Sequence, residues 1–125
     1  MKNLRRIIQG IAAVAVAVCG FSAWAALSEA EAREHLKRGA VVVDVRSADE
    51  FKAGHHAGVT NIPLADLKQR LSSVVTNKSQ VVLLHCQSGR RSGIAEAELR
   101  KLGYTNAFNL GSFEQAGKVL ARPKR

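Results

Sequence analysis

Short runs with the character of β-strands, of which residues 40–45 are the most β-branched, alternate along this chain with segments that carry the signals of helices. The runs lie at residues 40–45, 59–62, 81–85 and 107–110. The intervening and flanking segments predict helices at residues 28–39, 47–54, 64–71, 92–102 and 112–120. Continuously apolar strands are buried on both faces, and strands that alternate with helices form βαβ units. The pattern predicts an α/β fold: one domain with a central parallel β-sheet flanked by helices on both faces.

Two of the predicted helices have explicit start signals. Ser28 precedes Glu31 by three residues, and Ser47 precedes Glu50 by three. This spacing is that of a capping box, in which the serine hydroxyl accepts from a backbone amide of the first turn. Both positions therefore predict helix N-termini.

Residues 1–25 have the three parts of a secretory signal peptide. A positive start, a short apolar stretch and an Ala-x-Ala cleavage site follow one another as Lys2, Arg5 and Arg6, residues 7–18, and residues 23–25. We expect cleavage after Ala25, which leaves residues 26–125 as a periplasmic domain without stable membrane association. An uncleaved anchor is the weaker alternative, because alanine is only modestly hydrophobic. Lipid attachment at Cys19 is weaker still, because Val18 is not small.

Charge and cysteine content narrow the class of protein further. Loss of the signal segment lowers the net charge from +9 to +6, and the remaining cations are scattered among few aromatic residues. A nucleic-acid partner is therefore not expected.

The chain has two cysteines, and Cys19 leaves with the signal segment. Cys86 then remains as a lone thiol, which is either reactive or a buried inert residue.

The residues around Cys86 favour reactivity. The apolar run at 81–85 delivers Cys86 to the carboxyl edge of the predicted sheet, where open α/β proteins bind ligands. Gly89 permits a tight turn before the N-terminus of the next helix, and Arg90 and Arg91, which we place just before that helix, add positive charge. Such surroundings lower the pKa of a thiol. The sequence therefore predicts that Cys86 is a thiolate nucleophile.

Two families use a cysteine loop of this shape. Cysteine-dependent phosphatases and arsenate reductases need an arginine where this chain has Ser92. The chain instead resembles a single-domain exported rhodanese over nearly all of the predicted domain. The similar stretches are 43–46 with Glu50, 54–63, 86–91, 103–104 and 109–112. It departs from the family pattern at His56, where isoleucine is usual, and at Ser112, where glycine is frequent.

The resemblance implies a thiosulfate sulfurtransferase. Sulfane sulfur would pass from thiosulfate to Cys86 as a persulfide and then to cyanide or a thiol, including a thiol of a partner protein. The loop would hold the persulfide and the donor through Gln87, Ser88, Gly89, Arg90, Arg91 and Ser92. No metal and no organic cofactor is implied. A persulfide carrier is the alternative function, and a phosphatase or arsenate reductase is disfavoured by Ser92.

Residues close to the loop have competing interpretations. For Asp44 and Arg46 an ion pair is favoured over substrate contact, and for His85 a backbone hydrogen bond is favoured over general-base catalysis. His55 and His56 are adjacent, so in an extended segment they point apart and chelate a metal poorly. We expect Arg90 to reach over the pocket, and Arg91 to hold the loop or face solvent.

Overall fold

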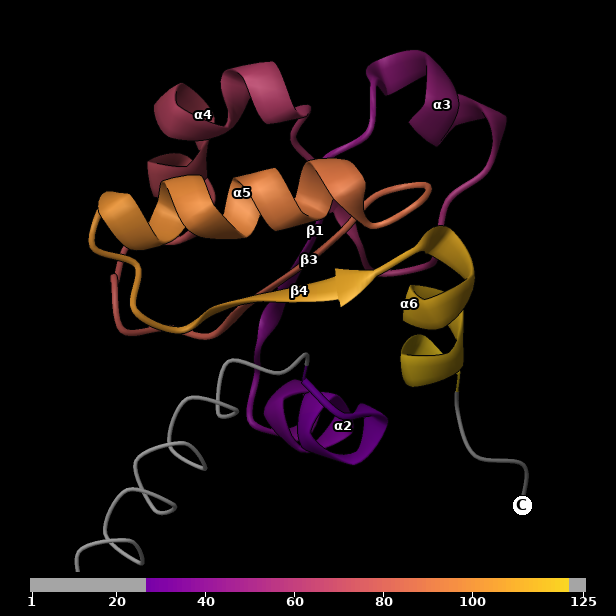
Figure 1. The fold of residues 1–125 in the computed structure, drawn as a ribbon, viewed down its shortest axis with the longest axis horizontal. Helices are drawn as coiled ribbons and strands as arrows, with labels where there is room; N and C mark the ends of the chain where they lie inside the picture. The colour runs from indigo at the N-terminus through magenta and orange to yellow at the C-terminus, as the bar shows by residue number, and fades with distance from the viewer. Residues whose placement is uncertain (1–26, 122–125) are drawn as a thin grey trace, which may run out of the picture.

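The computed structural model describes residues 27–121. Its sheet has four parallel strands in the order β2-β1-β3-β4: β1 (Val41–Asp44), β2 (Thr60–Asn61), β3 (Val82–His85) and β4 (Ala107–Gly111) (Figure 1). The expected signal segment lies outside the described residues. Among residues 27–121, no helix combines the length and apolar character that crossing a membrane requires.

Helices cover both faces of the sheet, which confirms the predicted fold class. Figure 1 shows α4 (Leu67–Val74) and α5 (Arg90–Lys101) on one side, and α2 (Glu29–Lys37) and α6 (Phe113–Leu120) on the other. The short helix α3 (Ala48–Ala53) follows β1, and a 3-10 turn, η2 (Leu64–Asp66), leads into α4. The caps agree with the sequence. Ser47 and Glu50 form a full capping box, and the Ser28 hydroxyl accepts from the Glu31 amide.

Alternation along the strands sends neighbouring side chains to opposite faces. Val43, Leu84 and Cys86 belong to the apolar core that also contains Leu71 and Leu99 of the α4 and α5 side. The side chains of Asp44 and His85 lie on the other face, where the His85 ring meets the Phe113 ring of α6 edge-on. The sulfur and the imidazole of two consecutive residues are therefore separated by the sheet.

The start of α5 corrects one prediction. Arg90 and Arg91 do not precede the helix but form its first turn, and Ser92 follows them inside it. The turn is made at Gly89, whose φ of +95° is a left-handed conformation that glycine adopts without strain. The first helical bond runs from the Gly93 amide to the Gly89 carbonyl at 3.1 Å. The Ser92 hydroxyl is directed at carbonyl groups of the loop and of β4.

Candidate active site

Cys86 follows β3 directly and is fully buried. Its amide donates to the carbonyl of Gly111 at the end of β4, at 3.3 Å, and the preceding His85 carbonyl accepts from the Val45 amide at 3.0 Å. The two bonds hold the backbone at Cys86 between its neighbouring strands. The residue predicted to be the nucleophile therefore stands at the carboxyl edge of the sheet, against the N-terminus of α5.

Hydrogen-bond donors surround the Cys86 sulfur. The Gly89 amide lies 3.0 Å from Sγ, and the Ser92 hydroxyl lies 3.5 Å from it. Burial raises the pKa of the Cys86 thiol, but hydrogen bonds from Ser92, Gly89 and Ser88 outweigh burial and lower the pKa below its ordinary value. The site therefore favours the thiolate, which is the nucleophilic form of cysteine.

Gly89 is required by space as well as by backbone conformation. A Cβ at this position would stand 3.3 Å from the Cα and carbonyl carbon of Gly111. The Ser92 hydroxyl also lies 3.2 Å from the Gly89 carbonyl and 3.4 Å from the Gly111 carbonyl. The loop is thus packed closely against the end of β4, and this packing fixes where its amides point.

Arg91 is tied to α3 by Glu50. Its Nη1 and Nη2 donate to the two carboxylate oxygens of Glu50, at 2.6 and 2.9 Å. The hydrogen bond from Arg91 lowers the pKa of Glu50 to about 2. The pKa of Arg91 is raised, first by the hydrogen bond to Glu50 and to a smaller extent by Cys86. Glu50 belongs to one of the motif stretches of the sequence, but no local sequence pattern predicts its pairing with Arg91.

The other loop side chains are placed differently. Arg90 is exposed, and within residues 27–121 its guanidinium has no hydrogen-bond or ion-pair partner. The Gln87 side chain accepts from Arg46 at 3.2 Å, and the Gln87 carbonyl accepts from the Phe113 amide at 3.2 Å. The backbone of Ser88 forms an isolated antiparallel β-bridge with that of Ser112. The loop is therefore anchored to α6 on one side and to α3 on the other.

Asp44 and Arg46 form a buried ion pair behind the loop. The shortest contact, from Arg46 Nη2 to Asp44 Oδ2, is 2.8 Å, and both side chains are almost entirely buried. Arg46 also donates to the Gly54 carbonyl at 2.7 Å. With its remaining nitrogen on Gln87, Arg46 connects the pair to the active loop without facing the sulfur.

The three histidines near the site have separate partners. His85 Nδ1 lies 3.2 Å from the Cys86 carbonyl oxygen. His55 stacks on Phe51, with ring centroids 3.8 Å apart, whereas His56 stacks on Phe113 at 4.0 Å and bonds the Phe113 carbonyl at 2.8 Å. In the described part of the chain, no group of three or more His, Cys, Asp or Glu side chains is placed to hold a metal ion.

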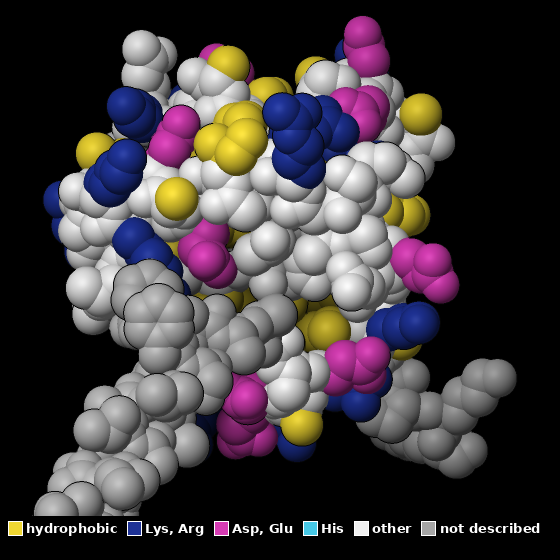
Figure 2. Space-filling model, in the orientation of Figure 1, with side chains coloured by type: hydrophobic (Ala, Val, Ile, Leu, Met, Phe, Trp, Pro, Cys, Tyr) yellow, Lys and Arg dark blue, Asp and Glu magenta, His cyan; other side chains and the backbone are white. Residues whose placement is uncertain are grey.

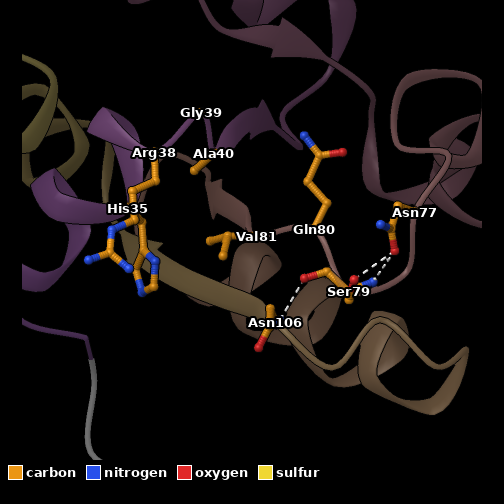
Figure 3. A pocket seen from close by; sticks show the side chains of 9 residues that line it. All are labelled: His35, Arg38, Gly39, Ala40, Asn77, Ser79, Gln80, Val81 and Asn106. Atoms are coloured by element: carbon orange, nitrogen blue, oxygen red, sulfur yellow. Dashed lines mark hydrogen bonds between the residues drawn. The ribbon is translucent and has the colours of Figure 1, made fainter.

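A separate cavity of about 520 Å³ opens at the opposite edge of the sheet (Figure 3). Its lining includes His35, Arg38, Gln80, Val81 and Asn106, and no residue of the Cys86 loop. Figure 2 shows Lys and Arg side chains interspersed with Asp and Glu side chains on the face in view, with no continuous basic area. Neither the cavity nor a basic surface area thus adds to the Cys86 site, and its chemistry comes from the residues of the loop.

Comparison with known proteins gives consistent similarities. Residues 28–116 match the family described as the Rhodanese-like domain. The chain is 44% identical over 98 residues to the uncharacterized protein YqhL of Bacillus subtilis, which covers 77% of this chain and 75% of that one. It is 37% identical over 82 residues to the thiosulfate sulfurtransferase PspE of Escherichia coli, covering 66% and 75% respectively. The structure of a human single-domain sulfurtransferase superposes with a TM-score of 0.63 at 29% identity, over 74% of this chain and 95% of that chain.

Proposed function

Because the chain belongs to the rhodanese-like domain family, we propose that it is a thiosulfate sulfurtransferase that works through a persulfide on Cys86. Family membership supports sulfurtransferase activity, and the relative named thiosulfate sulfurtransferase supports thiosulfate as the donor. The observation that carries the proposal is the Cys86 sulfur itself. It is buried at the end of β3, and the hydrogen bonds from the Gly89 amide and the Ser92 hydroxyl lower its pKa.

In the first half-reaction, the Cys86 thiolate attacks the outer sulfur of thiosulfate. A bond forms between Sγ and that sulfur, the sulfur–sulfur bond of thiosulfate breaks, and sulfite leaves as a dianion with the bonding electron pair. The enzyme then carries a persulfide anion. Loop amides placed beforehand stabilise this charge without reorganising during the reaction.

In the second half-reaction, an acceptor attacks the outer sulfur of the persulfide. Cyanide takes it as thiocyanate, and a thiolate takes it as a new persulfide, which allows a cysteine of a partner protein to serve as acceptor. In both cases the bond to Sγ breaks and its electron pair returns to Cys86 as thiolate. The covalent intermediate splits the transfer into two easier steps.

The arginines are proposed to divide the work of binding the thiosulfate dianion. Glu50 compensates most of the charge of Arg91, so Arg91 fixes the loop and adds little net attraction. Arg90 is exposed beside the loop, and its guanidinium is available for paired hydrogen bonds to sulfonate oxygens. Arg90 is therefore assigned to the donor.

The proposal is tested by replacing Cys86 with serine. Cys86→Ser is expected to abolish thiocyanate formation from thiosulfate and cyanide, because a serine hydroxyl stays protonated at neutral pH. Circular dichroism and the thermal midpoint check that the fold is retained. More than trace turnover in the serine variant would remove Cys86 as the nucleophile.

The position of the second arginine distinguishes this function from phosphatase chemistry. Only the insertion of one residue after Gly89 would move Arg91 to the position that a cysteine-dependent phosphatase requires. The wild-type chain, with Ser92 at that position, is expected to transfer sulfur and not to hydrolyse an aryl phosphate. Aryl phosphatase activity in the wild type would contradict the assignment.

A further inference from the structure

The imidazole of His85 is buried but takes no part in the sulfur chemistry described above. It lies on the α6 face of the sheet, with ring centroids of His56 and Phe113 at 5.6 and 6.1 Å. Its Nε2 is 3.8 Å from Asp44 Oδ2, and Arg46 occupies both oxygens of that carboxylate. The groups around His85 thus include one carboxylate, one guanidinium and a second imidazole.

The contacts of His85 determine which ring nitrogen carries the proton. Nδ1 lies 3.2 Å from the Cys86 carbonyl oxygen, which can only accept a hydrogen bond. Nε2 has no hydrogen-bond partner in the part of the chain that the structure describes. Burial lowers the pKa of His85, more than the Cys86 carbonyl and Asp44 raise it, which favours the neutral ring. Its single N–H is therefore on Nδ1 and is directed at the Cys86 carbonyl.

This hydrogen bond has a consequence for the next amide. A trans peptide is planar, with its C=O and N–H pointing in opposite directions. Because His85 holds the Cys86 carbonyl toward the α6 face, the Gln87 N–H of the same peptide points toward the face that carries the sulfur. Within residues 27–121 the Gln87 amide donates to no group. Its own carbonyl is held by the Phe113 amide, so the following peptide is fixed as well.

We propose that His85 is a positioning residue whose Nδ1–H orients the Cys86–Gln87 peptide, so that the Gln87 N–H is aimed at the outer sulfur of the persulfide. Rotation of this peptide would instead place the carbonyl oxygen near a negatively charged sulfur. The inference rests on the proposed function, since the outer sulfur is present only when Cys86 carries a persulfide. His85 acts through the backbone and touches no reacting atom.

Two substitutions separate this role from a purely structural one. His85→Asn retains an amide N–H close to the position of Nδ1, but it leaves a cavity that lowers stability. His85→Leu fills the volume and removes the unpartnered Nε2, which favours stability, but it also removes the donor. Positioning predicts that the asparagine variant is functionally closer to wild type. A purely structural role predicts instead that the leucine variant is functionally closer to wild type.

The experiment follows the Gln87 amide by two-dimensional ¹H–¹⁵N NMR while Cys86 is loaded with inorganic polysulfide. In wild type and His85→Asn, the Gln87 amide proton is expected to move downfield on loading. In His85→Leu this movement should be lost, and the persulfide lifetime should shorten about tenfold, as expected for one missing hydrogen bond to a charged group. An unchanged amide shift and lifetime in His85→Leu would overturn the proposal.

A measurement on the wild-type protein tests the proposal even where a variant does not fold. Long-range ¹H–¹⁵N correlation of His85 reports its tautomer, and a proton on Nε2 instead of Nδ1 would overturn the proposal. Polysulfide loading also keeps the test separate from the choice of donor. If polysulfide loads Cys86 but thiosulfate does not, the thiosulfate function fails while the Gln87 amide still reports on His85.

Discussion

The Arg91 guanidinium and the Glu50 carboxylate meet through hydrogen bonds of 2.6 and 2.9 Å, although 41 residues separate them in sequence. The pair joins the first turn of α5, beside the Cys86 sulfur, to the first turn of α3. It therefore holds one side of the loop and compensates one of the two arginine charges. Arg90 keeps its charge at the surface.

The first prediction concerns pH and Glu50. Its pKa in the folded protein is about 2, below the ordinary 4.5, so the stability from this pair is fully present above pH 4.5 and is lost as pH falls toward 2. Glu50→Gln keeps the capping contact with Ser47 but removes the charge. Because both side chains are about one-third exposed, the loss at pH 7 should be only about 0.5–1 kcal/mol. Urea unfolding of both proteins across pH 3–7 measures it. A stability difference that stays constant down to pH 3 would contradict the assignment.

The second prediction separates the two arginines. Arg90→Ala should lower kcat/KM for thiosulfate, mainly by raising KM, since a charge-assisted contact with the donor is lost. The fall should correspond to a loss of about 1.5–3 kcal/mol in transition-state stabilisation. Steady-state kinetics at low and high salt measures the effect. Lys101→Ala, at the other end of α5, removes one exposed charge away from the loop and serves as the control.

Replacement of Arg91 should affect stability as well as catalysis, unlike replacement of Arg90. Arg91→Ala should lower the thermal midpoint as well as activity, because the variant leaves Glu50 without its partner. Equal, small losses in Arg90→Ala and Arg91→Ala that disappear at high salt would show that both arginines contribute only general positive potential. That result would remove Arg90 as the residue that binds thiosulfate.

The third prediction concerns the Cys86 thiolate. Ser92→Ala removes a hydroxyl 3.5 Å from the sulfur, one of the donors that lower the pKa of Cys86. That pKa should rise, because the thiolate loses a donor. Because the thiolate reacts, the rising limb of the pH profile should move to higher pH. Iodoacetamide alkylation of Cys86 from pH 4 to 10 measures the midpoint, and Ser73→Ala in α4 is the matched control. An unchanged midpoint in Ser92→Ala would exclude the hydroxyl as a donor to the sulfur.

The fourth prediction concerns export. We propose that residues 1–25 are removed, so the protein from the cell envelope should begin at Ala26. N-terminal sequencing of the purified protein tests this directly. A sequence that begins at Met1 or Lys2 would mean that the segment is retained.

Much of the fold can be predicted from the sequence because the signals for its helices and strands are local. The capping box at Ser47 and Glu50 and the apolar run that becomes β3 depend on residues a few positions apart. Parallel pairing then follows from the alternation of strands and helices. The position of Cys86 at the carboxyl edge of the sheet follows from the same pattern, since the loop comes directly after β3.

The missed features depend on contacts between distant segments. The Arg91–Glu50 pair requires α3 to pack beside the start of α5, which no local pattern encodes. The early start of α5 depends on Gly89 turning against Gly111 of β4. For His85 the sequence predicts a backbone hydrogen bond, and the structure adds that its partner is the carbonyl of the adjacent Cys86.

The most direct test of the account is the mass of Cys86 after incubation with thiosulfate. Intact-protein and peptide mass spectrometry should find an added sulfur, about +32 Da, on the peptide that contains Cys86. The addition should disappear after cyanide, with thiocyanate released in equal amount, and it should be absent from Cys86→Ser. An unmodified Cys86 after incubation with excess thiosulfate, in a protein whose fold is intact, would contradict the proposed sulfur transfer from thiosulfate.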